Sequence, residues 1–318
     1  MSEIVATVVA PSRAGASRLP VLLRALASQD ADFAWEVVIV IDGLVDDSEQ
    51  VIASFPDVPA RTVVLAENQG RSAALNAGFD AASGHVLIRC DDDLEPDSDF
   101  VRLHVELHDG PERRGVIGLC RNVFPATPYA KAYGVEADHC FREAAYHAKA
   151  EQPWRYWAGN CSVTRADFDK VGHYDVNFRA YGWEDVDWGF RLARTGASIL
   201  LERRLEARHH LAATSAEERA IRAFYSGAAR ARFEAKHGVQ EPPVTTSPDM
   251  GARVWDGLVR TAAIAAREST IRRAGAAVDR VLPRLPPYLA EKTVALLVES
   301  SASSGYRVTQ GRLGSVDV

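Results

Sequence analysis

The sequence predicts an α/β protein with a mostly parallel sheet and helices on both faces. Through residues 4–90, short apolar runs rich in β-branched residues alternate with segments of helical apolar spacing. Alternation of strand and helix is typical of parallel sheets with right-handed crossovers. The composition agrees, because 47% hydrophobic and 25% charged residues are ordinary for a globular chain of 318 residues.

The predicted elements follow one another closely up to Pro96. We expect buried strands at 4–11, 35–42, 60–66 and 85–90. Helical spacing predicts helices at 17–29, 48–55 and 71–83, the last of them ended by Gly84. Farther along, the patterns predict helices at 99–108, 165–172, 184–196 and 216–238, strands at 115–124 and 197–210, and a helix-prone aromatic stretch at 128–157.

A change of composition at QEPPVTTSP (240–248) predicts a domain boundary. We therefore expect an α/β domain at 1–238 and a helical C-terminal extension at 239–318. In the extension, one face of the helix predicted at 253–267 carries Val254, Leu258, Ala262 and Ala265, and residues 251–292 hold eight Arg/Lys against four Asp/Glu. A basic amphipathic helix can contact anionic lipid head groups, but an ordinary solvated helix has the same pattern.

Charge, hydropathy and cysteine spacing exclude several classes of protein. The net charge of −6 argues against a general nucleic-acid binder, which needs a broad basic surface. No apolar run approaches the ~18–20 residues of a membrane span, and we see no secretory leader. The four cysteines are far apart and form no CxxC pair, so neither a zinc ribbon nor a disulfide scaffold is indicated. We expect a cytoplasmic protein.

Polar side chains gather where the predicted parallel strands end. Asp42, Asn68 and Asp91–Asp93 each follow a strand, and ligands of such sheets collect at the carboxyl ends of the strands. The D-x-D spacing of Asp91 and Asp93 suits a hard divalent cation shared with a diphosphate. A solvated turn or a helix cap would explain the same three acids.

Three further features surround these acids. In ENQGRSAALNAG (67–78), a glycine and a basic residue stand at a helix start, where free amide groups favour anions. In RAYGWEDVDWGFRL (179–192), acids at a helix start are flanked by tryptophans that either pack the loop or offer flat platforms for sugar rings. His209 shares a strand face with Leu205 and Ala207, so it can point into the site while His210 points away.

In this order, PSR (11–13), Asp42, NQGRSAALNAG (68–78), DDD (91–93) and GWEDVDWGFRL (182–192) resemble the family 2 glycosyltransferases. The resemblance covers roughly residues 3–238 and implies a GT-A fold, a Rossmann-like α/β architecture. The family usually has two adjacent acids after the second strand, whereas this chain has Ile41-Asp42. We match Asp42 to the second of them.

The resemblance implies a role for each matched position. Asp185 matches the catalytic base, and Asp93 and His209 match the metal ligands, with His210 as the alternative to His209. The residues implied to bind the nucleotide are Pro11, Ser12, Arg13, Asp42, Asn68, Arg71, Asp91 and Asp92. The residues implied to bind the acceptor are Trp183, Glu184 and Asp187.

The implied reaction is metal-dependent, inverting transfer of a sugar from a nucleotide diphosphate sugar to an acceptor hydroxyl, with Mn²⁺ or Mg²⁺ as cofactor. The aromatic loop YGWEDVDWG favours UDP-hexose or UDP-N-acetylhexosamine as the donor. The acceptor is a glycan, a lipid-linked compound or a small molecule, and contact with a membrane surface would run through the C-terminal helices. The sequence gives no indication of oligomeric state.

Two other functions compete with this interpretation. A sugar-phosphate nucleotidyltransferase shares the α/β pattern, but PSRAGASRLP (11–20) lacks the dense glycine loop of such enzymes, and Asp185 would be left unexplained. A non-catalytic carbohydrate-binding relative is the other alternative. The presence of Asp91, Asp93, Asp185 and His209 argues against it.

Overall fold

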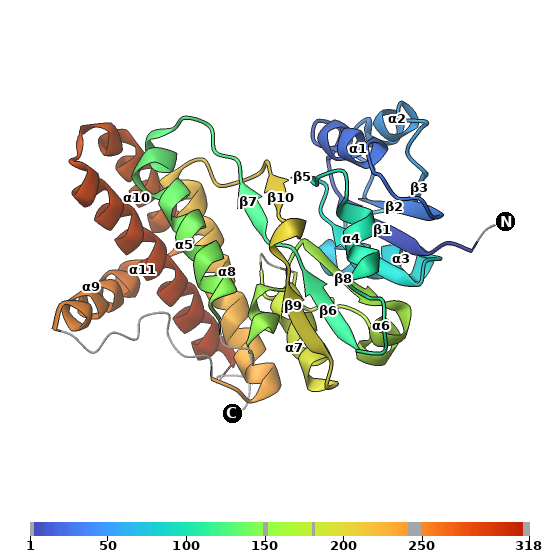
Figure 1. Cartoon of the computed structure of the whole chain (residues 1–318). Coiled ribbons are helices and arrows are strands. Elements are labelled where there is room, and N and C mark those ends of the chain that lie inside the picture. The colour runs from blue at the N-terminus through green and yellow to red at the C-terminus, as the bar shows by residue number, and fades with distance from the viewer. Residues whose placement is uncertain (1–2, 149–151, 180–181, 241–249, 314–318) are drawn as a thin grey trace. The chain divides into compact units, whose positions relative to one another are not determined.

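The computed structural model describes residues 3–148, 152–179, 182–240 and 250–313 (Figure 1). Contacts between residues divide the chain into two compact units. The first unit comprises 1–123, 140–179 and 184–211, and the second comprises 124–139, 180–183 and 212–318. This division differs from the predicted boundary after residue 238, because residues 212–238 pack with the C-terminal helices rather than with the sheet.

The first unit is built on a seven-stranded sheet with the order β3-β2-β1-β4-β8-β6-β9. The four strands at one side are mutually parallel, whereas β8 runs antiparallel to both of its neighbours and β9 runs parallel to β6. The mostly parallel sheet is therefore confirmed. The strands are β1 (Ala6–Ser12), β2 (Trp35–Asp42), β3 (Ala60–Leu65), β4 (Val86–Cys90), β6 (Arg114–Ile117), β8 (Asn160–Thr164) and β9 (Ser198–Leu201).

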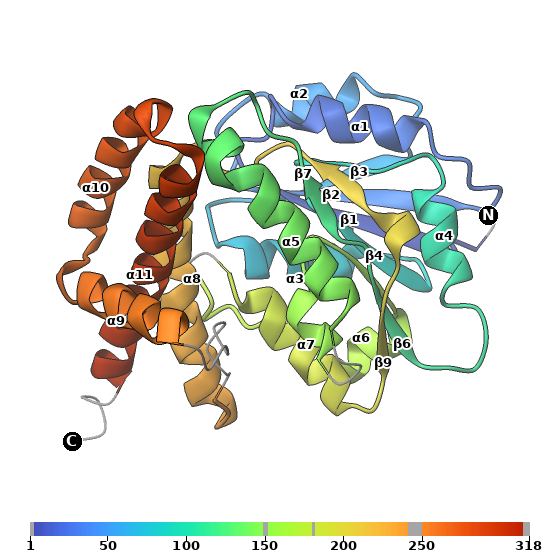
Figure 2. The same ribbon diagram turned by 60° about the vertical axis from the view of Figure 1, so that its left-hand side comes forward.

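Helices cover both faces of this sheet, as Figure 2 shows for α1 and α3. Successive residues of a strand point to opposite faces, so Val8 joins one core and Val9 the other. The core with Val8 also holds Leu22, and the core with Val9 holds Leu75. The helices of this unit are α1 (Leu19–Ala27), α2 (Ser48–Ala53), α3 (Arg71–Ala81), α4 (Phe100–Glu106), α6 (Arg165–Val171) and α7 (Glu184–Arg194).

A second, three-stranded sheet has the order β5-β10-β7. Its strands are β5 (Leu94–Glu95), β10 (Ala207–His209) and β7 (Cys120–Asn122). The strand predicted at 115–124 is thus two strands in different sheets. Gly118 lies at the break between them, where an added Cβ would collide with the Leu205 carbonyl oxygen and the Asn160 side chain. Residues 197–210 likewise divide into β9 and β10.

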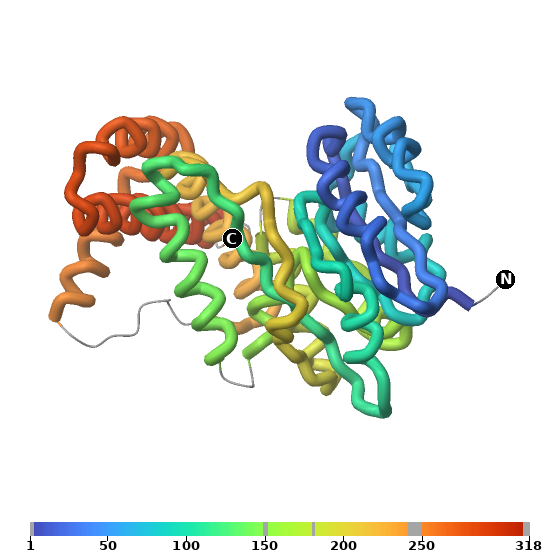
Figure 3. The backbone as a smooth tube through the Cα atoms, turned by 45° about the horizontal axis from the view of Figure 1, so that its top comes forward, coloured from blue at the N-terminus to red at the C-terminus, as the bar shows by residue number. Residues whose placement is uncertain are grey.

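The described part of the second unit is helical, with α8 (Ala216–His237), α9 (Met250–Ala265), α10 (Glu268–Val281) and α11 (Pro287–Leu313). Helix α5 (Val135–Tyr146) begins in this unit and ends in the first. Helices α8 and α11 pack closely (Figure 3), because Gly227 faces Ala302 and Gly305 faces Phe224 with no room for a Cβ. No helix within the described ranges has the length and apolar character needed to cross a membrane.

Candidate active site

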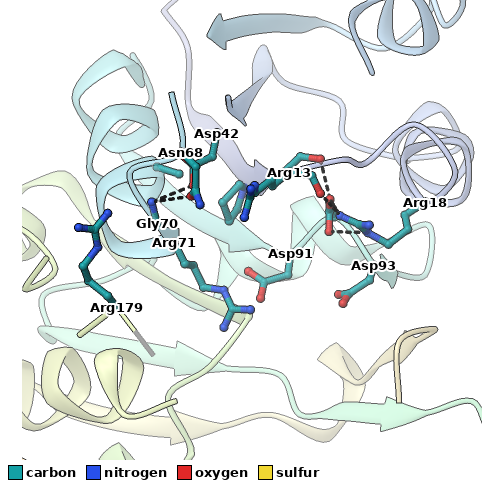
Figure 4. Close-up of a pocket in the computed structure, with 13 residues that line it drawn as sticks. Arg13, Arg18, Asp42, Asn68, Gly70, Arg71, Asp91, Asp93 and Arg179 are labelled. Atoms are coloured by element: carbon teal, nitrogen blue, oxygen red, sulfur yellow. Dashed lines mark hydrogen bonds and ion pairs between the residues drawn. The ribbon is translucent and has the colours of Figure 1, made fainter. Parts of the chain in front are cut away.

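A pocket of about 380 Å³ lies in the first unit, at the carboxyl ends of β1, β2 and β4 (Figure 4). The start of α3 closes another side of it. Asp42, Asn68 and Asp91–Asp93 all line this pocket, as their positions after successive strands predict. Its lining consists of Pro11, Ser12, Arg13, Arg18, Asp42, Asn68, Gly70, Arg71, Ala74, Asp91, Asp92, Asp93 and Arg179.

Asp42 fixes the turn that leads into α3. Its Oδ1 accepts a hydrogen bond of 2.6 Å from the Gln69 backbone N–H, and its Oδ2 accepts one of 2.9 Å from Gly70. Gly70 adopts φ +93°, a conformation that favours glycine. Asp42 therefore sets the direction of the first turn of α3, whose free amide groups suit an anion.

Asp92 fixes the loop that follows β1. Its carboxylate accepts a hydrogen bond of 2.6 Å from the Ser12 hydroxyl and forms an ion pair of 2.7 Å with Arg18 Nη2. This loop also carries Arg13 to the wall of the pocket. Asp92 and Asp42 thus shape the pocket by holding the loops that line it.

Asp91 is joined to a buried arginine on β4. The Arg89 side chain is 0% exposed, and its Nε and Nη2 donate to the two Asp91 oxygens at 2.8 and 3.1 Å. Arg89 Nη1 also donates to Asp185 Oδ1 at the start of α7. Burial would raise the pKa of Asp91, but the positive charges of Arg89 and then Arg71 outweigh it and lower that pKa.

Asp93 faces His209 rather than His210. His209 Nε2 lies 3.2 Å from Asp93 Oδ2, and His209 Nδ1 lies 2.6 Å from Asn122 Oδ1. His210 Nε2 instead contacts Glu95 at 2.6 Å. Asn122 and Asp93 thus contact the two ring nitrogens of His209 from opposite sides and fix the orientation of the ring.

Glu184 and Asp185 begin α7 in different surroundings. Glu184 is 2% exposed, and its Oε1 pairs with Arg71 Nη1 at 3.0 Å. Its buried Oε2 has no hydrogen-bond partner among the described residues. Burial, and next the neighbouring Asp185 carboxylate, raise the pKa of Glu184 to about 7. Asp185, paired with Arg89, has a side chain that is 14% exposed.

The raised pKa of Glu184 predicts a pH-dependent effect of Glu184→Gln on stability. The folded-state pKa of about 7 exceeds the reference value of 4.5. The protonated Glu184 carboxyl therefore contributes to the free energy of unfolding in full below pH 4.5, and this contribution is lost as the pH rises through 7. Glutamine does not titrate. We expect the free energy of unfolding of the wild type, relative to Glu184→Gln, to fall by about 3 kcal/mol over this range.

Denaturant unfolding of both proteins across this pH range measures the difference. Glu112→Gln, at a carboxylate whose side chain is 73% exposed, is the control for the same change of charge. A constant difference for Glu184→Gln would show that the buried carboxyl titrates normally.

No residue of the 182–192 motif is among those that line the pocket. Glu184 and Asp185 are connected to it through Arg71 and Arg89, whereas three other residues of the motif are held elsewhere. Asp187 is 0% exposed and forms an ion pair of 3.0 Å with Arg191, so its carboxylate serves the packing of α7 and cannot reach an acceptor. Trp183 belongs to the second unit, where its indole N–H donates to Ser226 Oγ at 3.2 Å. Trp188 is buried and stacks on Trp157, which excludes it as an open platform for a sugar.

A sequence model described as "Glycosyl transferase family 2" matches residues 7–172. This match covers the strands that form the pocket and more than half of the chain. The chain belongs to glycosyl transferase family 2.

Curated sugar transferases are similar to this chain over part of their length. The validoxylamine A glucosyltransferase of Streptomyces hygroscopicus subsp. jinggangensis (strain 5008) is 27% identical over 233 residues, which cover 64% of this chain and 55% of the relative. The undecaprenyl-phosphate 4-deoxy-4-formamido-L-arabinose transferase of Pseudomonas syringae pv. syringae (strain B728a) is 37% identical over 178 residues, 53% of this chain and 44% of the relative. The chain thus spans about half the length of these relatives.

Solved structures share the fold. A mannosyltransferase, PcManGT from Pyrobaculum calidifontis in complex with GDP-Man and Mn²⁺, superposes with a TM-score of 0.60 at 17% identity, covering 94% of this chain and 86% of that one. S. aureus TarS 1–349 superposes with a TM-score of 0.52 at 14% identity, covering 97% and 92%. The expected GT-A-type fold is therefore confirmed.

Sequence reasoning missed three arginines of this family 2 site. Arg18 and Arg179 line the pocket, and Arg89 lies behind it. Arg89 had left a signal, because an arginine inside an otherwise apolar buried strand needs a buried partner. Arg18 and Arg179 have no such signal in the sequence. Each reaches the pocket from a segment outside the regular elements, and the path of that segment depends on contacts in the folded chain.

Arg179 offers a direct test of what the pocket binds. Arg13 and Arg179 form no ion pair with any other residue in the described ranges, so both guanidinium groups are available to phosphate oxygens. We expect Arg179→Ala to weaken the binding of a nucleoside diphosphate by about tenfold, measured by calorimetric titration. Arg24→Ala, an exposed α1 arginine outside this pocket, is the control. Equal affinities of the two variants would contradict the assignment.

Proposed function

We propose that the chain is a metal-dependent, inverting glycosyltransferase that moves a sugar from a nucleoside diphosphate sugar to an acceptor hydroxyl. The observation that carries the proposal is the pocket itself. In a family 2 chain, it combines Asp91 and Asp93 with the cationic side chains of Arg13, Arg71 and Arg179. Figure 4 shows Asp91 and Asp93 directed into the same space. A diphosphate with its counter-cation needs both kinds of charge.

In this proposal, the donor lies along the ends of β1, β2 and β4. Pro11 and Ser12 form a wall, and Asn68 and Asp91 offer hydrogen bonds to the nucleoside. Asp42 and Asp92 contribute through the loops they hold, and Arg13, Arg71 and Arg179 balance the phosphate charge. The base and sugar are proposed to be uracil and a hexose or N-acetylhexosamine because the sequence of the 182–188 loop resembles that of family members; Trp183 and Trp188 themselves do not line the pocket.

The residues present fit a divalent cation, Mn²⁺ or Mg²⁺. His209 Nε2 and Asp93 Oδ2 lie 3.2 Å apart, and imidazole and carboxylate are ligands that a divalent cation can bind together at that spacing. The Asn122 side chain contacts the other ring nitrogen at 2.6 Å and so orients the His209 ring for this role. Within the described ranges no cluster of three or more His, Cys, Asp or Glu side chains could hold the ion, so donor oxygens would complete the shell. When bound, the cation neutralises the departing diphosphate.

Asp185 is proposed to act as the general base. Its carboxylate takes the proton of the acceptor hydroxyl as the acceptor oxygen forms its bond to the anomeric carbon. The bond from that carbon to the diphosphate oxygen breaks with its electron pair, so a single displacement inverts the configuration. Arg89 keeps Asp185 in place, and Glu184, buried and held by Arg71, is proposed to brace the start of α7 beside it rather than to contact the acceptor.

The names of the relatives suggest chemical classes for the acceptor. One curated relative is a validoxylamine A glucosyltransferase and another is an undecaprenyl-phosphate sugar transferase. We propose a hydroxyl-bearing acceptor, either a small molecule, a glycan or a lipid-linked compound. A nucleotidyltransferase is disfavoured by the family match and by the pairing of Asp185 with Arg89.

Calorimetric titration with UDP, GDP and dTDP, each with and without Mn²⁺, tests the proposal. We expect UDP to bind, and to bind more tightly with Mn²⁺. Tight binding of GDP or dTDP instead would keep the transferase and replace the base. A folded protein that binds none of the three would favour the non-catalytic relative.

We also propose a cytoplasmic protein that touches the membrane surface through α9. This helix packs inward through Ala263, while Met250, Val254, Leu258 and Ile264 on another face are 82%, 61%, 50% and 69% exposed. The exposed side chains Arg253 and Arg260 lie seven residues apart beside that apolar face. An exposed apolar stripe with a basic flank suits anionic lipid, the charge of the cytoplasmic leaflet.

Leu258→Glu is expected to reduce binding to anionic vesicles. Burial of a leucine at the lipid interface is lost, and a negative charge faces the head groups. Pelleting with phosphatidylserine-containing vesicles at low and high salt measures the effect. Val176→Glu in the first unit is the matched control, because both residues are 50% exposed and the charge change is the same. No pelleting of the wild type at low salt would remove the proposed membrane contact.

A further inference from the structure

Arg89 is a buried charge that two motifs of the site share. Its guanidinium is 0% exposed, while the Asp91 and Asp185 side chains that it contacts are 21% and 14% exposed. The cation therefore lies beneath the two carboxylates, each of which keeps one side open. Asp91 belongs to the D-x-D segment after β4, and Asp185 to the first turn of α7.

The contacts use the planar shape of the arginine side chain. Nε and Nη2 form a fork on the two Asp91 oxygens, and Nη1 donates to Asp185 Oδ1. Asp185 Oδ2 is thereby left for another partner. The guanidinium carbon also lies over the Tyr174 ring, 5.8 Å from the ring centroid, which is a cation–π contact. A lysine would keep the charge but could not reach three oxygens in one plane.

The surroundings of Asp91 preserve this geometry. The Asp91 backbone N–H donates to the Gly159 carbonyl at 3.0 Å, and a Cβ at Gly159 would lie 2.6 Å from Asp91 Oδ2. Glycine at 159 therefore leaves the room that the Asp91 carboxylate needs in order to meet Arg89. The position of Asp185 is in turn tied to that of Asp91 through a single rigid group.

We propose that Arg89 is the positioning residue of the reaction: it holds the Asp185 carboxylate in register with the nucleotide-binding segment at Asp91. The inference rests on the proposed function, in which Asp185 is the base. Arg89 touches neither donor nor acceptor and acts only through the two aspartates. Small displacements of a reacting group are costly, about 10²-fold in rate for ~1 Å, so a shared anchor for base and donor matters to turnover.

A double-mutant cycle between Arg89→Lys and Asp185→Asn tests the inference. Turnover is measured as release of nucleoside diphosphate from the sugar nucleotide, with water as the acceptor. We expect Arg89→Lys alone to lower turnover by about 10²-fold. When Asp185→Asn is already present, the same change should lower turnover by less than about threefold, because both substitutions act through the Asp185 carboxylate. Equal factors in both backgrounds would mean that Arg89 has a merely structural role.

A second variant covers the case in which Arg89→Lys does not fold. Gly159→Ala displaces the Asp91 carboxylate from Arg89 while the buried cation stays in place, and the same non-additivity with Asp185→Asn is expected. Additive losses here would also overturn the inference. Metal-dependent nucleotide binding by the wild type is measured first and tests the proposed function alone, so the two failures can be told apart.

Discussion

Asp185→Asn is expected to lower turnover by about 10²–10⁴-fold while leaving nucleoside diphosphate affinity almost unchanged. Asparagine keeps the size of the side chain and an oxygen for Arg89 Nη1, so the start of α7 should persist. It cannot take a proton from the acceptor. The loss should therefore appear in kcat, with little change in the calorimetric affinity for the nucleotide.

Asp169→Asn is the matched control for this experiment, because Asp169 is an exposed carboxylate on α6 outside the pocket. It should leave both turnover and affinity unchanged. Normal turnover of Asp185→Asn would remove Asp185 as the base. If Glu184→Gln were then inactive, the role would pass to the neighbouring carboxylate.

Asp93→Ala is expected to abolish the metal-dependent part of nucleotide binding and, with it, turnover. The side chain supplies one of the two protein ligands proposed for the cation, and no third acidic, cysteine or histidine side chain of the described residues is grouped with them to replace it. Titration with the nucleotide, with Mn²⁺ and with EDTA, should give two equal affinities for this variant. For the wild type we expect them to differ by about tenfold or more.

The adjacent histidines provide the control for the same measurement. His209→Ala should lose metal dependence as Asp93→Ala does, whereas His210→Ala should keep it, because His210 contacts Glu95 instead. Metal dependence that survived in Asp93→Ala and His209→Ala would place the ion elsewhere. A loss in His210→Ala alone would reverse the assignment.

The regular first half of the fold was predictable because its signals are local. The strands β1–β4 and helices α1–α3 follow from apolar periodicity, and the meeting of Asp42 with Asp91–Asp93 follows from parallel strands. Strand β8 was missed because NCSVT is mostly polar. Its Asn160 and Ser162 are buried and hydrogen-bonded to His104, a pairing that only the fold reveals.

The site was only partly predictable for the same reason. Which of His209 and His210 faces Asp93 followed from the alternation of a strand, and the structure agrees. Burial of Asp187 and the attachment of Trp183 to α8 depend on contacts between segments far apart in the sequence. No pattern within the 182–192 motif distinguishes these residues from Asp185.

The small sheet β5-β10-β7 has a consequence for the order in which the chain folds. Asp93 and His209 are separated by 116 residues, and His209 and Asn122 by 87. The strands that bring them together are two or three residues long, so they contribute little local stability of their own. Long chain closures are slow and need prior structure to make them favourable. A refolding chain should thus complete its seven-stranded sheet first and assemble the metal site proposed at Asp93 and His209 last.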